Sequence, residues 1–341
     1  MTAAALTDFT LPPELEAREP AEARGVARDG VRMLVSRRRT GELTHHPFDE
    51  LENLLLPGDL LVVNTTATIP AAVPCGPGLS VHFSTPLPDG SWLAELRARD
   101  GVATRPYPGG SAGGVYRLPG GAELTLQERA TGRLWRVRLS TAVVPYLLRH
   151  GTHIRYSYVK RDWPTSAYQT AFSTWPGSAE MPNASRPFTP EVVTRLVVRG
   201  VMIAPITLHT GVSSLEGDEE PYPEPYDVPP ATARLVNAAR RAGGRVIAVG
   251  TTVVRALESA AAGAPDGAVS ASSGWTNHVV TPETGVAAVD GLLTGFHEPR
   301  SSHLRMLTAF AGPGLLRRCY EAAIEHGYLW HEFGDVHLLL P

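Results

Sequence analysis

The sequence has very little cysteine and no long apolar run. Its two cysteines, Cys75 and Cys319, supply neither a disulfide framework nor a CxxC metal motif. No stretch approaches the roughly 18 consecutive apolar residues of a membrane span. The first twenty residues also lack the basic start and long apolar block of a secretory signal. These absences argue against a disulfide-rich or membrane-spanning protein, and we expect a cytoplasmic protein with no membrane partner.

A strong net charge is lacking as well. The chain has 31 Lys and Arg against 34 Asp and Glu, which gives a net charge of −3 and argues against a bulk polyanion binder. Lys160 is the only lysine, so a nucleic-acid contact would have to come from a local arginine patch. Two groupings offer such a patch, although solvated surface charge is the simpler interpretation of both: Arg37, Arg38 and Arg39, and Arg133, Arg136 and Arg138.

The 341 residues are enough for about two domains, at roughly 150 residues each. Between residues 69 and 144, short alternating segments are separated by Asp-Gly, Gly-Gly and Thr-Gly turns. This pattern is typical of a small antiparallel β-barrel or sandwich. We therefore expect an inserted β-barrel domain at 69–144, within a discontinuous main domain formed by residues 1–68 and 145–341.

The rest of the chain has the pattern of a mixed α/β protein. Residues 30–37 and 41–46 resemble a hairpin, 48–55 a short helix and 60–63 a buried strand. Strands and helices then alternate, which predicts an α/β fold for this part. The expected elements are helices at 189–200, 230–242, 252–262 and 302–310, and strands at 201–208, 245–250 and 292–296.

The sharpest local signal is a strand that ends at Gly250 and leads through Thr251 and Thr252 into a helix. The free N–H groups and the dipole at a helix N-terminus favour an anion such as a carboxylate or phosphate. Arg255 and Glu258 lie three residues apart on one face of this helix, so both could face the same site. An ordinary capped helix with a surface ion pair is the alternative interpretation. GxGxxG and GxxxxGK[ST] motifs are absent, which disfavours dinucleotide-binding and P-loop sites.

Two histidines stand where strands run into turns. His209 precedes Gly211, and Glu224 in the acidic stretch 216–227 could orient it as a general base. His297 lies beside an X-Pro kink, close to Arg300. A lone histidine is more often structural than catalytic, and that interpretation stays open for both. Neither residue belongs to an HxxxH or HExxH spacing, so we expect no metal. His326 and His331 are interpreted as surface residues.

Seven segments, in order, resemble motifs of the S-adenosylmethionine:tRNA ribosyltransferase-isomerases of queuosine biosynthesis. Each motif is weak alone, but the shared order over nearly the whole chain makes a chance similarity improbable. The segments are 8–12 (DFxLP), 56–66 (PGDLLVxNDT), 168–170 (RYQT), 207–209, 249–258, 296–299 and 333–335 (YGDAM).

The resemblance implies a barrel-like α/β catalytic domain with an inserted β-barrel, in agreement with the change of pattern at residue 69. It also implies the reaction. The ribosyl part of S-adenosylmethionine, the co-substrate, is transferred to a 7-aminomethyl-7-deazaguanine in tRNA with a GUN anticodon and rearranged to an epoxycyclopentanediol. Adenine and methionine leave. No metal is implied.

This chemistry sets demands on the residues already singled out. A base must reach the acidic C5′ protons beside the sulfonium, and His209 or His297 are the candidates. A carboxylic acid, Glu224 or Asp335, would help adenine to leave.

The methionine carboxylate needs an anion site, which Gly250, Thr251, Thr252 and Arg255 could form. The remaining expected contacts are Tyr168 or Phe296 against the sulfonium, and Asn64, Thr65, Gln169, Glu258 and Arg300 elsewhere in the substrate site.

Several departures fall inside the motifs. An acid and an arginine are missing after Asn64, and Pro187 stands where the family has a histidine. Lost arginine and histidine groups could remove contacts to tRNA phosphates or to the deazaguanine. The altered segments are 64–67 (NDTR in the family), 181–189 (APTAGLHFT), 211–215 (GAGTF), 222–224 (HxE) and 295–301 (NFHLPKS).

Three hypotheses are therefore compatible with the sequence. The first is the family enzyme acting on tRNA. The second is a relative that cleaves S-adenosylmethionine but uses a small-molecule acceptor. The third is a non-catalytic RNA-binding or scaffold descendant, against which the retained His209, Glu224, Arg255, His297 and Asp335 argue.

Overall fold

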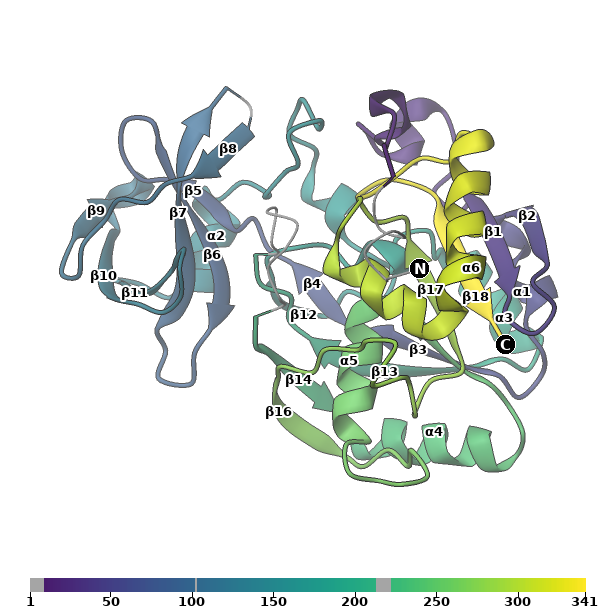
Figure 1. The fold of residues 1–341 in the computed structure, drawn as a ribbon. Coiled ribbons are helices and arrows are strands. Elements are labelled where there is room, and N and C mark those ends of the chain that lie inside the picture. Colours follow the sequence, from purple (N-terminus) through teal and green to yellow (C-terminus); the bar gives the residue numbers. More distant parts are fainter. Residues whose placement is uncertain (1–8, 102, 213–221) are drawn as a thin grey trace.

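The computed structural model describes residues 9–101, 103–212 and 222–341. Asp8 of the first motif and residues 213–221, which include part of the 211–215 motif and of the acidic stretch, lie outside the described residues. The described chain forms a nine-stranded mixed sheet, a seven-stranded antiparallel sheet and a two-stranded sheet (Figure 1). The mixed α/β prediction is thereby confirmed.

The nine-stranded sheet is built from segments that lie far apart in the sequence. Strands β13, β3, β15 and β17 are mutually parallel, and β18 reverses the direction beside β17. The two outer strands, β16 and β2, are not paired with each other within the described residues. In spatial order the strands are β16 (Ser272–Thr276), β14 (Glu224–Val228), β13 (Met202–Leu208), β3 (Leu60–Asn64), β15 (Val246–Val249), β17 (Gly291–Gly295), β18 (Val336–Leu340), β1 (Arg32–Arg37) and β2 (Leu43–Pro47).

Helices cover both faces of this sheet because its central strands are apolar on both sides. Val62 and Ala248 contribute to one core with helices α4, α5 and α6, whereas Leu61 and Ile247 contribute to the opposite core with α1 and α3. Alternate residues of a strand point to opposite faces, so two separate cores result. The helices are α1 (Leu51–Leu54), α2 (Val143–His150), α3 (Pro190–Val198), α4 (Pro230–Arg241), α5 (Thr251–Ala260) and α6 (Ser302–Glu325), with short 3₁₀ helices at Pro13–Leu15, Ala21–Arg24, Phe48–Glu50, Pro119–Gly121, Thr165–Tyr168 and Asn183–Ser185.

Helix α6 is longer than the predicted 302–310. It continues past a kink at Gly312, whose φ is 67°, and Pro313 then starts the second half. Because proline is favoured in the first turn of a helix, the Gly-Pro-Gly sequence separates two helical halves here and does not end the element.

The segment around residues 69–144 folds into the seven-stranded antiparallel sheet, which lies beside the main sheet and its helices (Figure 1). This sheet has a core of its own, which includes Phe83, Leu124 and Trp135. Its strand order is open, with β5 and β9 at the ends. The strands are β5 (Ala72–Pro74), β6 (Leu79–Pro86), β7 (Trp92–Asp100), β11 (Leu134–Leu139), β10 (Glu123–Arg129) and β9 (Val115–Arg117), with β8 (Ala103–Pro106) paired to β7.

The two-stranded sheet consists of β4 (Thr66–Thr68) and β12 (Trp175–Ser178). It lies between the two larger sheets in Figure 1.

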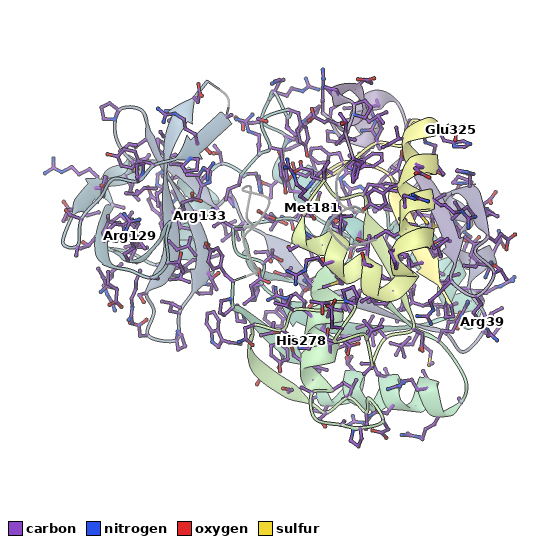
Figure 2. All side chains as sticks on the ribbon, in the orientation of Figure 1. Arg39, Arg129, Arg133, Met181, His278 and Glu325 are labelled. Carbon is purple, nitrogen blue, oxygen red and sulfur yellow. The ribbon has the colours of Figure 1, made fainter. Side chains whose placement is uncertain are left out.

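The two arginine groupings do not form one patch. Arg39 lies beside β1 and β2, and Arg133 lies in the seven-stranded sheet, at the other end of the molecule in Figure 2. Arg133 is also committed to a buried ion pair, because its Nη1 donates to Glu95 Oε2 at 2.7 Å. Arg136 pairs with Asp89.

None of the helices in the described part of the chain combines the length and apolar character that a membrane span requires.

A buried ion pair fastens the edge of the main sheet that lies opposite the site described below. Asp59 accepts hydrogen bonds from the N–H of Leu56 (2.7 Å) and of Arg245 (3.1 Å), and from the Arg245 guanidinium. Burial alone would raise the pKa of Asp59, but these hydrogen bonds outweigh it and lower the pKa. The Pro-Gly-Asp turn is thereby tied to the start of β15.

We expect Asp59→Asn to lower the free energy of unfolding by about 3 kcal/mol, because it leaves the Arg245 guanidinium without its counter-charge in a largely buried place. Denaturant unfolding followed by circular dichroism measures the loss. The exposed pair Arg317–Glu321 supplies the control, and Glu321→Gln should cost less than about 1 kcal/mol. Equal losses in the two variants would contradict a structural role for the Asp59 pair.

Candidate active site

A cavity of about 190 Å³ opens at one edge of the nine-stranded sheet. Strand direction brings its walls together. The carboxyl ends of β3, β13, β15 and β17 share this edge, and so do the amino ends of β14 and β18. Figure 2 places Met181 and His278, which both line the cavity, in the half of the main body nearer to the seven-stranded sheet. The lining comes from residues 154–156, 180–183, 210–212, 222, 224, 250–252, 255, 278–280, 297–299, 301–303, 306 and 331–332.

One wall is the start of α5. Gly250 has a φ of 96°, a conformation that L side chains rarely adopt, and its turn delivers Thr251 and Thr252 to the cavity. Asn64 supports this wall from behind. Its side-chain amide donates to the carbonyl of Leu208 (2.8 Å) and to Thr252 Oγ1 (3.3 Å). The amino end of α5 thus presents N–H groups and a positive dipole end to the cavity, as an anion site requires.

Glu224 and Arg255 form a buried ion pair at the cavity. Arg255 donates through Nη1 to Glu224 Oε2, while Glu224 Oε1 accepts from the N–H of Gly211 at 2.9 Å. The remaining guanidinium nitrogens donate to main-chain carbonyls, including those of Thr276 (3.1 Å) and His278 (3.2 Å). Burial raises the pKa of Glu224, although Arg255 opposes this effect. Arg255 therefore positions Glu224 and adds positive charge, with most of its donors already used.

His297 faces the cavity from the loop after β17. Its Nε2 lies 2.8 Å from Thr294 Oγ1, and its ring stacks on that of His303 with 4.5 Å between centroids. The main chain is also held, because the N–H of His297 donates to the hydroxyl oxygen of Tyr320 (3.2 Å). Burial, together with the nearby His303 and His331, lowers the pKa of His297 well below its ordinary value. The imidazole is therefore neutral near pH 7 and able to accept a proton.

The predicted pairing of His209 with Glu224 is not formed. His209 Nδ1 lies 2.8 Å from Thr66 Oγ1, and Gly177 packs against its ring. Since Glu224 is occupied by Arg255, no hydrogen bond orients His209 through that carboxylate. His209 adjoins the cavity-lining Thr210 but does not itself line the cavity.

Asp335 and Phe296, both predicted at the site, lie outside the cavity lining. Asp335 accepts from the N–H groups of Arg32 and Leu329, each at 2.8 Å, and thereby closes the loop before β18. Phe296 is fully buried, and its ring lies tilted against that of Trp330 with 4.8 Å between ring centroids. Both residues shape the loops that carry the cavity.

Six other predicted contacts also lie outside the cavity lining, each engaged elsewhere in the fold. Glu258 accepts from the N–H groups of Ala287 and Ala288, and Arg300 stands at a positive φ of 63° in the 296–301 turn. Asn64 holds the α5 wall as described. The other three are Thr65, bonded to the carbonyl of Ile206 (3.0 Å), Gln169, which pairs its amide with the main chain of Thr68, and Tyr168, which stacks on His153 at 4.2 Å.

Seven Arg, His and Glu side chains of the cavity were not predicted as site residues, among them Arg155, His278 and Glu298. Glu180, His303, His331 and Glu332 all line it, and the prediction that His331 is a surface residue is wrong. The sequence offered one signal for two of them: His331 and Glu332 directly precede the 333–335 motif, which suggests a place near the site. Their place at the cavity follows from the reversed direction of β18, which the sequence does not show. In the described part of the chain, no group of three or more His, Cys, Asp or Glu is placed to hold a metal ion.

Comparison with known proteins identifies the family. A family model described as "Queuosine biosynthesis protein" matches residues 5–339. The S-adenosylmethionine:tRNA ribosyltransferase-isomerase of Heliobacterium modesticaldum is 35% identical, over 98% of this chain and 99% of its own length. The enzyme of the same name from Moorella thermoacetica is 37% identical, over 98% of each chain.

A solved structure agrees with this result. The crystal structure of S-adenosylmethionine tRNA ribosyltransferase from Thermotoga maritima matches with a TM-score of 0.56 and 28% identity, over 98% of this chain and 99% of that one. Both comparisons span nearly the whole chain, and the motif segments 249–258 and 296–299 meet at one cavity. The chain therefore belongs to the queuosine biosynthesis protein family.

Proposed function

We propose that this protein transfers the ribosyl part of S-adenosylmethionine to a 7-aminomethyl-7-deazaguanine in tRNA and rearranges it to the epoxycyclopentanediol of epoxyqueuosine. One observation carries the proposal. The matched family motifs are scattered over the chain, and segments from several of them converge on one cavity of about 190 Å³. Adenine and methionine are the leaving products. The acceptor tRNA carries a GUN anticodon, and the reaction takes place in the cytoplasm without a metal.

The methionine carboxylate of S-adenosylmethionine binds at the start of α5. The N–H groups and hydroxyls of Thr251 and Thr252 face the cavity there, and the positive end of the helix dipole lies behind them. Arg255 adds positive charge from beneath this wall. Gly250 lets the chain turn sharply enough to aim these groups inward.

His297 removes the C5′ proton beside the sulfonium. Its ring lines the cavity and is neutral near pH 7, as a base must be. Glu224 is suited to help adenine leave, because burial raises its pKa and favours its protonated form. His209, outside the lining, has a supporting role through Thr66.

We further propose that residues 69–144 form an inserted β-barrel domain of the discontinuous main domain 1–68 and 145–341. The separate hydrophobic core of this segment supports the assignment. The position of the seven-stranded sheet supports a role of this domain in tRNA binding. The sheet lies beside the half of the main body where Met181 and His278 line the cavity (Figure 2).

Incubation with S-adenosylmethionine tests the proposed reaction. We expect adenine and methionine to be released in equal amounts, and only when tRNA bearing the aminomethyldeazaguanine is present. The same tRNA with guanine at that position is the matched control. Equal release without RNA would replace the tRNA acceptor with a small molecule, and no release at all would support a non-catalytic protein.

Substitution of two glycines with positive φ tests the proposed anion site at the start of α5. Gly250→Ala strains the α5 start, and Gly263→Ala strains an exposed turn after the same helix, where φ is 84°. Each should lose about 1 kcal/mol of unfolding free energy. Only Gly250→Ala should weaken S-adenosylmethionine binding, by at least about tenfold in calorimetry, because only there does the strain move helix N–H groups that bind a carboxylate. Unchanged affinity in Gly250→Ala would contradict this binding mode.

Substitution of the two histidines separates the base candidates. We expect His297→Asn to slow single-turnover adenine release by about 100-fold or more, because the proton acceptor is lost. His209→Asn should slow it less than tenfold, since His209 does not line the cavity. Calorimetric binding of S-adenosylmethionine and the circular dichroism spectrum check that each variant is folded. A larger effect at His209 would reverse the assignment.

A further inference from the structure

Glu332 is a buried carboxyl whose surroundings leave it short of partners. It lies in the loop between α6 and β18, lines the cavity and is 8% exposed. Its Oε2 atom is fully buried and receives no hydrogen bond from any residue that the structure describes. A buried polar atom without a partner is costly, so such an atom at a cavity wall indicates a group that binds there.

The positive charges nearest to Glu332 are committed to other acidic groups. Arg186 donates to Glu22 Oε2 at 2.8 Å, and Arg155 pairs with Asp162 at 3.1 Å. Burial and the negative charge of Glu180 raise the pKa of Glu332 to about 8, although Arg186 and Arg155 oppose this shift.

The other ionisable groups near Glu332 bring no positive charge. Burial raises the pKa of Tyr156, Tyr158 and Tyr168, so their hydroxyls stay neutral. His331 is also neutral near pH 7, because burial lowers its pKa to about 4, and burial raises the pKa of Glu298 beside it. This part of the cavity therefore holds carboxyl groups, and the arginine that lines it, Arg155, is paired with Asp162.

We propose that Glu332, with Glu180 beside it, binds the primary ammonium group of the acceptor nucleobase and takes its proton. This inference rests on the proposed function, in which the acceptor is an aminomethyl group. An ammonium nitrogen has no lone pair, so it must lose a proton before it can form a bond to carbon. The proton passes to Oε2 of Glu332, and the nitrogen keeps the electron pair of that N–H bond. The freed pair forms the new bond to the ribosyl carbon while the bond from that carbon to its leaving group, adenine or methionine, breaks and its electron pair departs with that group. The proton transfer itself changes no oxidation state.

The alternative cation is the methionine ammonium of S-adenosylmethionine, and strand order disfavours it. The carboxylate of that methionine is assigned to the start of α5, which follows β15. The Glu332 loop enters β18, and β17 separates these two strands. Two strand spacings correspond to about 10 Å. The methionine ammonium and carboxylate are bonded to one carbon atom, so strand order favours a separate cation at Glu332.

The proposal has a consequence for pH dependence. In the empty cavity Glu332 is mostly protonated at pH 7, because its pKa is about 8. An ammonium group binds the ionised form, so acceptor binding should strengthen as pH rises from 7 through 8. Removal of the carboxyl should abolish this dependence.

Glu332→Gln tests the assignment, because it keeps the side-chain shape and removes the proton acceptor. We expect wild-type protein to bind tRNA with the aminomethyldeazaguanine about tenfold more tightly at pH 8 than the same tRNA with guanine. Glu332→Gln should bind both equally. Its kcat/KM for the acceptor should fall by at least about 30-fold and lose the rise through pH 8, while its affinity for S-adenosylmethionine stays within twofold.

Glu321→Gln is the matched control. It makes the same carboxyl-to-amide change on α6, at a side chain that is 64% exposed and lies outside the cavity lining. We expect its tRNA discrimination and pH profile to match wild type. Weaker S-adenosylmethionine binding in Glu332→Gln, or preserved discrimination and pH dependence, would overturn the inference while leaving the transferase function intact. Equal adenine release by the wild-type protein with and without tRNA would instead overturn the proposed function.

Discussion

The candidate active site depends on one constraint, the shared direction of the central strands. Because β13, β3, β15 and β17 are parallel, the loops that follow them all leave the sheet at the same edge. Loops at the carboxyl ends of parallel strands are where α/β proteins build their binding sites. The reversal at β18 adds a further loop to this edge, since its amino end lies beside the carboxyl end of β17. The cavity is thus an outcome of sheet topology, and the segments that carry Gly250, His297 and Glu332 each adjoin a buried strand.

Electrostatics divides the cavity into two regions with different states of charge. At the start of α5, Arg255 donates to the carboxyl group of Glu224, and the positive end of the helix dipole favours an anion. At Glu332, burial and the negative charge of Glu180 oppose ionisation of the carboxyl group, and the nearest arginines, Arg186 and Arg155, are paired with other carboxylates. A co-substrate with a carboxylate and an acceptor with an amine fit this division. The arrangement suits two substrates that must meet with their charged groups held apart.

Several residues of the family motifs serve the scaffold of the site. Asn64 bonds to the main chain of β13 and to Thr252, and Asp335 closes the loop that presents Glu332. Phe296 fills the core beneath His297. A motif recognised in the sequence therefore contains residues that position the loops as well as residues that line the cavity. Short polar side chains at strand ends are needed to hold the loops as well as to touch a substrate.

The sequence by itself determined the local elements and the family. Period-two alternation identified the strands of the 69–144 segment, and the Thr189-Pro190 start and Gly250 turn located helices α3 and α5. The seven ordered motifs identified the family. Six of the residues predicted for the site line the cavity: Gly250, Thr251, Thr252, Arg255, Glu224 and His297.

Only the tertiary structure decided which side chains share the cavity. Glu332 and His331 follow a long helix in the sequence, and nothing local tells that β18 runs against β17 and carries them to the same edge as Gly250. The partner of Glu224 was decided in the same way, because a contact between Arg255 and a residue 31 positions away depends on packing of α5 against β14. Sequence patterns report the period and ends of single elements, whereas contacts between distant elements follow from strand order and direction.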